Sequence, residues 1–239
     1  WRERILDHFL QTDATWEFFM ETFSTTDRVC HMGMRHFDAD HPRFDEELAN
    51  SETTFFGETL RLRDAVPAIY VQMDRIVGKT LEAMRPDDRL MIVSDHGFSS
   101  IHRRVNLNNW LWEHGYLAVK EDYTSTGALQ YVDWANTTAY SVGLGKIFLN
   151  LKGREFQGMR GFAATVEPAD ASDLLDRIAS ELKALADPGR DGAKVIREVY
   201  RRDQVFDGPL QDHAADLFVG FEDHYLISNA GYSVQIMTD

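Results

Sequence analysis

Apolar residues recur at helical spacing in three long segments of the chain. In 1–11 they fall at Trp1, Ile5, Leu6, Phe9 and Leu10, and in 172–185 they form one continuous stripe, so each segment predicts an amphipathic helix. The segment 51–85 has the same spacing, but Pro67 predicts two helices or a kink there. A shorter helix is expected over 108–114, ending at Gly115.

Shorter apolar runs predict the strands. The aromatic-rich segment 16–23 and the aliphatic run 90–94 both have the composition of buried strands. A helix is expected to open over 28–35, directly after the first of these strands, and the helical segment 51–85 precedes the second. This order of strand, helix and strand implies a right-handed parallel crossover. Further strands are expected over 116–119, 137–142, 146–151, 193–200, 216–221 and 225–228. The sequence therefore predicts an α/β fold with a mostly parallel sheet sandwiched by helices.

The polar stretch 37–50, which contains His41 and Pro42, predicts a loop excursion near the ends of the first strands. No repeat, low-complexity tract or linker divides the chain of 239 residues, 44% of which are hydrophobic. We therefore expect a single α/β domain over 1–239, large enough for one sizeable core.

The charge balance narrows the possible partners. Lys and Arg number 25 against 39 Asp and Glu, a net charge of −14, which argues against a nucleic-acid-binding surface. A small phosphate ester stays compatible with this charge, because bound cations would dominate the local field. The oligomeric state is left open.

The compartment is constrained only by what the sequence lacks. The single cysteine, Cys30, excludes an internal disulfide and agrees with a reducing compartment. The sequence shows no apolar run of membrane-spanning length and no signal peptide, so we expect a cytoplasmic location. The helical pattern is already under way at Trp1, and we expect a preceding segment, which could carry a targeting sequence.

Asp27 and His31 form the first candidate site. If a helix begins near Asp27, the two residues are four apart and share one helical face, where a carboxylate and an imidazole can bind one cation. The alternative is that Asp27 caps the helix and His31 is an ordinary first-turn residue.

Asp95 and His96 form the second candidate site, directly after the run 90–94. The alternative for this pair is a polar turn with Gly97 behind it. Two Asp/His pairs at the carboxyl ends of consecutive parallel strands, however, are what a site for two cations requires. Nitrogen and carboxylate ligands suit zinc best, with manganese or iron possible.

Several motifs together resemble the alkaline phosphatase superfamily, in particular its type I phosphodiesterase/nucleotide pyrophosphatase branch. They are Thr-Asp-Arg-Val-Cys-His at 26–31, Ser-Asp-His-Gly-Phe at 94–98, Asn-Leu-Asn-Asn-Trp-Leu at 106–111, and the segments 134–140, 147–155 and 215–221. The resemblance implies an alkaline-phosphatase-like core that binds two divalent metal ions, zinc above all. It places Asp27 and His31 on one ion and Asp95 and His96 on the other. The implied reaction is hydrolysis of a phosphate mono- or diester by a Thr or Ser nucleophile.

The chain departs from that pattern at both ends. The first strand of the core, with the nucleophile, is expected before Trp1, so no catalytic nucleophile is assigned in this sequence. The third ligand of the Asp27/His31 ion is normally a His in a late Gly-Asp-His stretch, and none follows 216–221. With two ligands per ion, we expect this chain alone to bind metal weakly and to show no turnover.

Three further alternatives stay open. Arg103 could reach an anionic substrate, or it could belong to a solvated basic turn. A degenerate relative could keep the fold as a non-catalytic binding module. Sulfatases and phosphonate hydrolases use similar metal geometry, so the ester class is not fixed by these residues.

Overall fold

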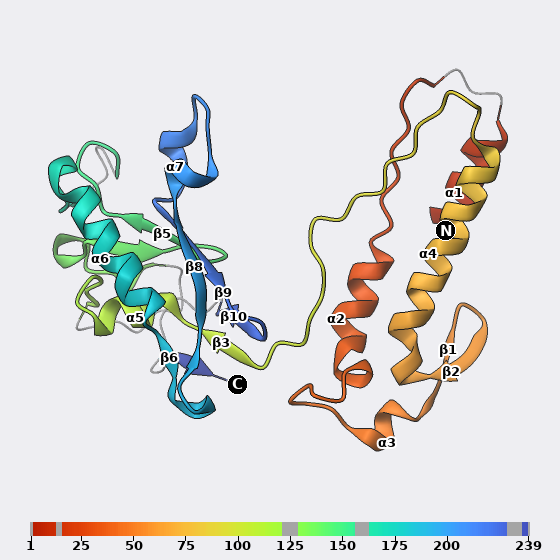
Figure 1. Ribbon diagram of the computed structural model, residues 1–239, viewed down its shortest axis with the longest axis horizontal. Helices are drawn as coiled ribbons and strands as arrows, with labels where there is room; N and C mark the ends of the chain where they lie inside the picture. The colour runs from red at the N-terminus through yellow and green to blue at the C-terminus, as the bar shows by residue number, and fades with distance from the viewer. Residues whose placement is uncertain (1, 13–15, 121–128, 156–162, 229–235, 239) are drawn as a thin grey trace. The chain divides into compact units, whose positions relative to one another are not determined.

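The computed structural model describes residues 2–12, 16–120, 129–155, 163–228 and 236–238. The chain forms two compact units, Trp1–Ser100 and Ile101–Asp239, and each is described by itself (Figure 1). The expectation of a single domain stays a prediction. The described residues contain no helix long and apolar enough to cross a membrane.

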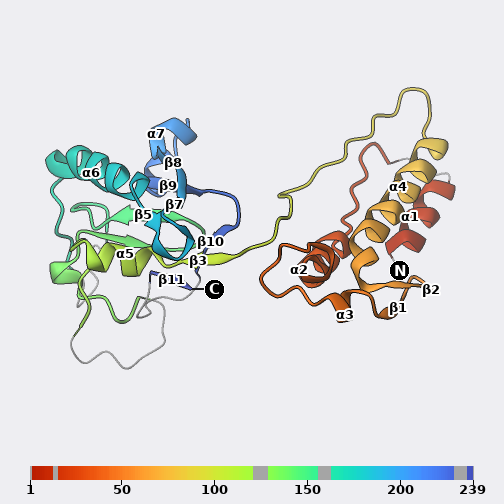
Figure 2. The same cartoon turned by 60° about the horizontal axis from the view of Figure 1, so that its bottom comes forward.

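The first unit is built mainly from helices. Helix α4 packs against α1 and α2, and α3 packs against the lower end of α2 (Figure 2). The amphipathic helix predicted over 1–11 is confirmed by α1, and the one expected after residue 23 by α2. The elements are α1 (Arg2–Gln11), α2 (Thr25–Phe37), α3 (Glu46–Ala49), β1 (Glu52–Phe55), β2 (Glu58–Arg61), the 3-10 turn η1 (Leu62–Asp64) and α4 (Ala65–Ala83).

The prediction of strands over 16–23 and 90–94 is wrong. Neither segment has regular hydrogen-bonded structure, and Met91, Ile92 and Val93 are 70–83% exposed. A strand forms only where a neighbouring strand accepts and donates its backbone hydrogen bonds. Among the described residues no strand pairs with either segment, so their apolar composition does not produce a sheet.

The prediction of two helices or a kinked helix over 51–85 is also corrected. Residues Glu52–Arg61 form an antiparallel hairpin, with Phe56 and Gly57 both at positive φ, as a tight two-residue turn requires. Helix α4 begins only at Ala65 and is unbroken to Ala83. Pro67 does not interrupt it, because it lies in the first turn, where a backbone N–H has no partner within the helix.

The polar excursion over 37–50 is loop except for α3. Its acidic residues serve local turns: an Asp45 carboxylate oxygen accepts from the Leu48 N–H at 2.9 Å and caps α3, and Asp38 accepts from the Asp40 N–H at 3.0 Å. The structure therefore explains this acidic run by turn and capping chemistry.

The second unit combines three sheets with helices, the smallest being the antiparallel pair β6-β7. A four-stranded antiparallel sheet has the order β4-β5-β9-β8, and a three-stranded sheet has the order β10-β3-β11. Its strands are β3 (Arg103–Val105), β4 (Ala139–Ser141), β5 (Lys146–Leu149), β6 (Ala186–Asp187), β7 (Ala193–Lys194), β8 (Ile196–Arg201), β9 (Leu217–Phe221), β10 (Tyr225–Ile227) and β11 (Met237–Thr238). Its helices are α5 (Leu107–Glu113), α6 (Ala171–Lys183), α7 (Arg202–Val205) and the 3-10 turns η2 (Trp134–Asn136), η3 (Pro168–Asp170), η4 (Pro188–Arg190) and η5 (Gln211–His213).

The mixed α/β composition is confirmed, but the expected parallel order is shown only in part. Among the named strands that the structure describes, β10 and β3 form a parallel pair, while the four-stranded sheet is antiparallel throughout.

The hairpin predicted around 143–145 is confirmed by β4 and β5, with Gly143 and Gly145 at positive φ. The helix predicted over 172–185 is confirmed by α6, which packs on β8 (Figure 1). The strand predicted over 116–119 is reduced to a single bridge between Val119 and Val132.

A buried ion pair stabilises the centre of the second unit. Both guanidinium Nη atoms of Arg154 donate to the Asp216 carboxylate at 2.7 Å, and that carboxylate also accepts from the Leu149 N–H at 2.7 Å. The Asp216 side chain is only 5% exposed. A buried charge with these partners is tolerated, whereas the same charge without its cation is strongly destabilising.

We predict that Arg154→Met lowers the free energy of unfolding of the second unit by about 3 kcal/mol, because Asp216 keeps its burial and loses its main partner. The matched control is Lys152→Met, which removes an exposed ion pair with Glu167 and is expected to cost less than about 1 kcal/mol. Urea unfolding of both variants measures the difference. Equal losses in the two variants would contradict this role of Arg154.

Candidate functional site

Helix α2 has one buried face and one exposed face. Cys30, Gly33 and His36 are buried, while Asp27 and His31 lie on the exposed side. The helix begins after Ser24, so Asp27 lies within the first turn and the capping alternative is wrong. A carboxylate in the first turn is favoured by the positive end of the helix dipole.

Asp27 and His31 meet as their spacing predicts. The His31 Nε2 atom lies 3.4 Å from Asp27 Oδ1, and both side chains are about half exposed. The i, i+4 geometry of the helix therefore holds one carboxylate oxygen and one imidazole nitrogen together on the surface.

His96 joins this pair from a loop. Its Nε2 atom lies 3.7 Å from the same Asp27 oxygen and 3.8 Å from Asp95 Oδ2. The expectation that this residue stands at the end of a strand is corrected, since the preceding run is irregular. The Ser94 hydroxyl instead donates to the His96 carbonyl at 2.6 Å and closes a tight turn.

A hydrogen bond to the main chain orients the His96 ring. Its Nδ1 atom lies 3.0 Å from the Gly97 carbonyl oxygen, which can only accept, so in the neutral ring Nδ1 carries the proton. The lone pair is then on Nε2, the atom nearest to Asp27. Metal-ligating histidines are oriented in this way, with the other ring nitrogen bonded to a carbonyl or a carboxylate.

These atoms are of the types that bind zinc, and two of their separations resemble those between donor atoms on one ion. Two donor atoms on one tetrahedral zinc ion, each about 2.0–2.1 Å from it, lie about 3.3 Å apart. The two separations at Asp27 Oδ1, 3.4 and 3.7 Å, are close to that value. As they stand, the described residues contain no group of three or more His, Cys, Asp or Glu arranged tightly enough to hold an ion. The fit therefore rests on donor type and on the spacing of single pairs.

Pairwise contacts link the four predicted ligands in a cluster: Asp27 contacts His31 and His96, and Asp95 contacts only His96 among them. Asp95 contributes least, because its side chain is 92% exposed. Phe98, which the sequence analysis quoted in a motif without giving it a role, contacts both imidazoles edge-on, with ring centroids 4.9 Å from His31 and 5.3 Å from His96. No periodicity in the sequence marks such a contact. Which residue holds which ion stays a prediction.

Arg103 has a structural partner in the second unit. Its Nε atom lies 3.1 Å from Asp187 Oδ2 and its Nη2 donates to Oδ1 at 3.3 Å, and the Asp187 side chain is fully buried. Tyr225 and the Gly189 N–H donate to the same carboxylate. These contacts favour a structural role for Arg103, and its contact with substrate stays a prediction.

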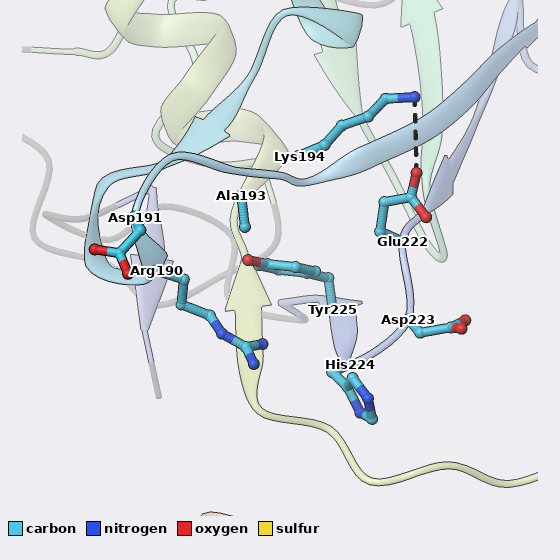
Figure 3. A pocket seen from close by; sticks show the side chains of 8 residues that line it. All are labelled: Arg190, Asp191, Ala193, Lys194, Glu222, Asp223, His224 and Tyr225. Carbon is cyan, nitrogen blue, oxygen red and sulfur yellow. Dashed lines mark ion pairs between the residues drawn. The ribbon is translucent and has the colours of Figure 1, made fainter.

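The second unit also has an open hollow of about 550 Å³ (Figure 3). Lys194 Nζ lies 3.7 Å from Glu222 across its rim, and the Arg190 guanidinium lies 5.9 Å over the Tyr225 ring. Lys194 is thus paired with a carboxylate of the lining and Arg190 with an aromatic ring, and we assign the hollow no chemistry. The lining residues are Arg190, Asp191, Ala193, Lys194, Glu222, Asp223, His224 and Tyr225.

Comparison with known proteins gives one finding. The family model described as type I phosphodiesterase / nucleotide pyrophosphatase matches residues 2–235. No curated protein and no solved structure gives a significant match.

Helix α2 also generates a prediction about pH. Burial, reinforced by the neighbouring Arg35 guanidinium, lowers the pKa of His36 below its ordinary 6.5. The Arg35 Nε–H donates to His36 Nε2 at 3.0 Å, a bond that needs the neutral ring. The unfolded chain therefore takes up a proton before the folded one, so this contribution to stability is complete above pH 6.5 and is lost as the pH falls through the lowered pKa.

We expect the wild type to lose more stability between pH 7.5 and 5.5 than His36→Gln, which has no titratable group there. His8→Gln, a change at an exposed histidine of α1, should behave as the wild type. Urea midpoints at the two pH values make the comparison. An equal loss in all three proteins would show that His36 does not set this dependence.

Proposed function

The chain belongs to the type I phosphodiesterase/nucleotide pyrophosphatase family, and from that premise we propose that it carries the metal-binding residues of a phosphoric ester hydrolase. Membership of this family supports a phosphoric ester hydrolase as the reaction class. The proposal goes further in naming Asp27, His31, Asp95 and His96 as ligands of two divalent ions, zinc above all.

One observation carries the proposal. Asp27 Oδ1 lies 3.7 Å from His96 Nε2 and 3.4 Å from His31 Nε2, so one carboxylate oxygen faces two imidazole nitrogens. Carboxylate oxygen and imidazole nitrogen are donor types that zinc prefers, and their meeting on one surface supports a cation there. A divalent ion there would supply positive charge to polarise a phosphoryl oxygen and to make a hydroxyl or water more acidic.

The chain's own residues then have separate tasks. Asp27 supplies a carboxylate held in the first turn of α2, and His31 supplies a nitrogen from the same face. The Gly97 carbonyl keeps the proton of the neutral His96 ring on Nδ1. Asp95 is exposed and available as a further oxygen ligand. The attacking group in this proposal is a Thr or Ser hydroxyl, as the resemblance to the family implies.

The net charge of −14 also bears on the substrate. An acidic surface repels a phosphate ester at long range, so binding of such a ligand depends on cations held at the site. The proposal therefore requires metal for substrate binding as well as for the reaction.

We predict that His96→Ala in the full-length protein lowers kcat/KM for phosphate esters by at least about 100-fold, since even residues that only orient metal ligands cost 10–100-fold. Because His96 is half exposed, the thermal midpoint should change little. His8→Ala is the matched control, a histidine of the same unit far along the chain from the cluster.

The assay uses a phosphomonoester, a phosphodiester and a sulfate ester, with zinc and with a chelator. Loss of all activity with the chelator, and in His96→Ala but not in His8→Ala, supports the proposal. Full activity in His96→Ala contradicts the ligand assignment. A full-length protein that hydrolyses none of the esters while keeping its fold would instead be a non-catalytic binding module.

A further inference from the structure

An apolar cavity of about 240 Å³ lies between α2 and α4 in the first unit. Its described lining contains no charged side chain. Two polar groups lie at its wall: the Cys30 thiol donates to the Tyr70 hydroxyl oxygen at 4.0 Å, and Tyr70 is half exposed. The lining residues are Cys30, Met34, Phe37, Val66, Pro67, Tyr70 and Phe98.

The cavity adjoins the candidate metal ligands through two residues. Phe98 lines the cavity and also contacts the rings of His31 and His96. Cys30, in the cavity wall, immediately precedes His31 on α2. An apolar group attached to a phosphoryl group at Asp27, His31 and His96 would therefore have a hydrophobic space beside it.

We propose that this cavity receives the leaving group of the substrate, and that this group is a single aromatic ring or a short alkyl chain. The inference rests on the proposed hydrolase function and names its substrate class as phosphoric esters of small apolar alcohols or phenols.

The size of the cavity supports one ring. An apolar cavity of about 150 Å³ is enough for benzene, and pockets for drug-sized ligands begin at about 300 Å³. The value of about 240 Å³ lies between these limits.

The chemistry of the lining favours an apolar leaving group over a polar one. A sugar or a nucleoside would bring several hydroxyl groups into a space whose described lining offers only the Cys30 thiol and the Tyr70 hydroxyl as polar side-chain groups. Each buried hydroxyl without a partner costs about 1–3 kcal/mol, which would make such esters poor ligands here.

Phenol binding to the metal-free protein tests the cavity without any reaction. We expect saturation-transfer NMR to show phenol bound to the wild type, and Met34→Trp to abolish that signal because the indole fills the space. The matched control is Met32→Trp, the same change on the same helix at a side chain that is 76% exposed, which should bind phenol normally. Equal phenol signals in the two variants would overturn the proposal.

A second variant guards against misfolding of Met34→Trp. Val66, 6% exposed, lines the cavity, and Val66→Ala enlarges it. We expect this variant to bind 2-naphthol, which the wild type binds at least about tenfold more weakly. No gain for 2-naphthol in a folded Val66→Ala protein also counts against the cavity.

Hydrolysis by the zinc-loaded full-length protein separates the two proposals. We compare kcat/KM for a phenyl ester with kcat/KM for a methyl ester in each variant. The ratio of the two values should be about tenfold lower in Met34→Trp than in Met32→Trp. The intrinsic reactivity of the esters cancels, because the same two esters are used for both variants. Hydrolysis with an unchanged ratio overturns the cavity assignment and leaves the hydrolase standing. Phenol binding that Met34→Trp abolishes, in a protein that hydrolyses no ester, overturns the hydrolase and leaves an apolar binding site.

Discussion

The close contact between α2 and α4 is the constraint on which the candidate site depends. Gly33 allows it, since a Cβ at that position would lie 3.0 Å from the Val66 Cγ2 atom. With α2 held there, Cys30 and His36 are buried beneath it and Asp27 and His31 are turned outward. The same contact leaves the apolar cavity beside the metal-ligand cluster. One packing interaction thus positions both the proposed metal ligands and the proposed leaving-group site.

The two units differ in how their polar groups are satisfied. In the second unit, buried carboxylates have dedicated partners: Asp216 has Arg154, and Asp187 has Arg103 and Tyr225. Such fully bonded networks make a rigid scaffold. In the first unit, Asp27, His31 and His96 are half exposed and meet at distances longer than hydrogen bonds. In a structural network, buried polar side chains form hydrogen bonds with one another. In a ligand-binding site, polar side chains lie close together and keep donor or acceptor atoms available for the ligand.

The sequence predicted elements well where local periodicity determines the structure. Helices α1, α2 and α6 and the β4–β5 hairpin follow from apolar spacing and from glycines at positive φ. The prediction failed for 16–23 and 90–94, because a strand depends on a distant partner that composition does not reveal. The break predicted at Pro67 failed for a related reason. A proline is tolerated in the first turn of a helix, and Pro67 falls there because the preceding hairpin ends at Arg61 and delays the start of α4. For the site, the i, i+4 spacing predicted the Asp27/His31 contact, but the approach of His96 and the part played by Phe98 arise from tertiary packing.

The central claim is that Asp27, His31, Asp95 and His96 are ligands of divalent metal ions, and X-ray absorption at the zinc edge of the zinc-loaded full-length protein tests it most directly. The account predicts a first shell of nitrogen and oxygen at about 2.0–2.1 Å with outer-shell scattering from imidazole rings. It also predicts that His96→Ala removes one imidazole contribution, while His8→Ala leaves the spectrum unchanged. A zinc spectrum without imidazole scattering, or one that His96→Ala does not alter, would contradict it.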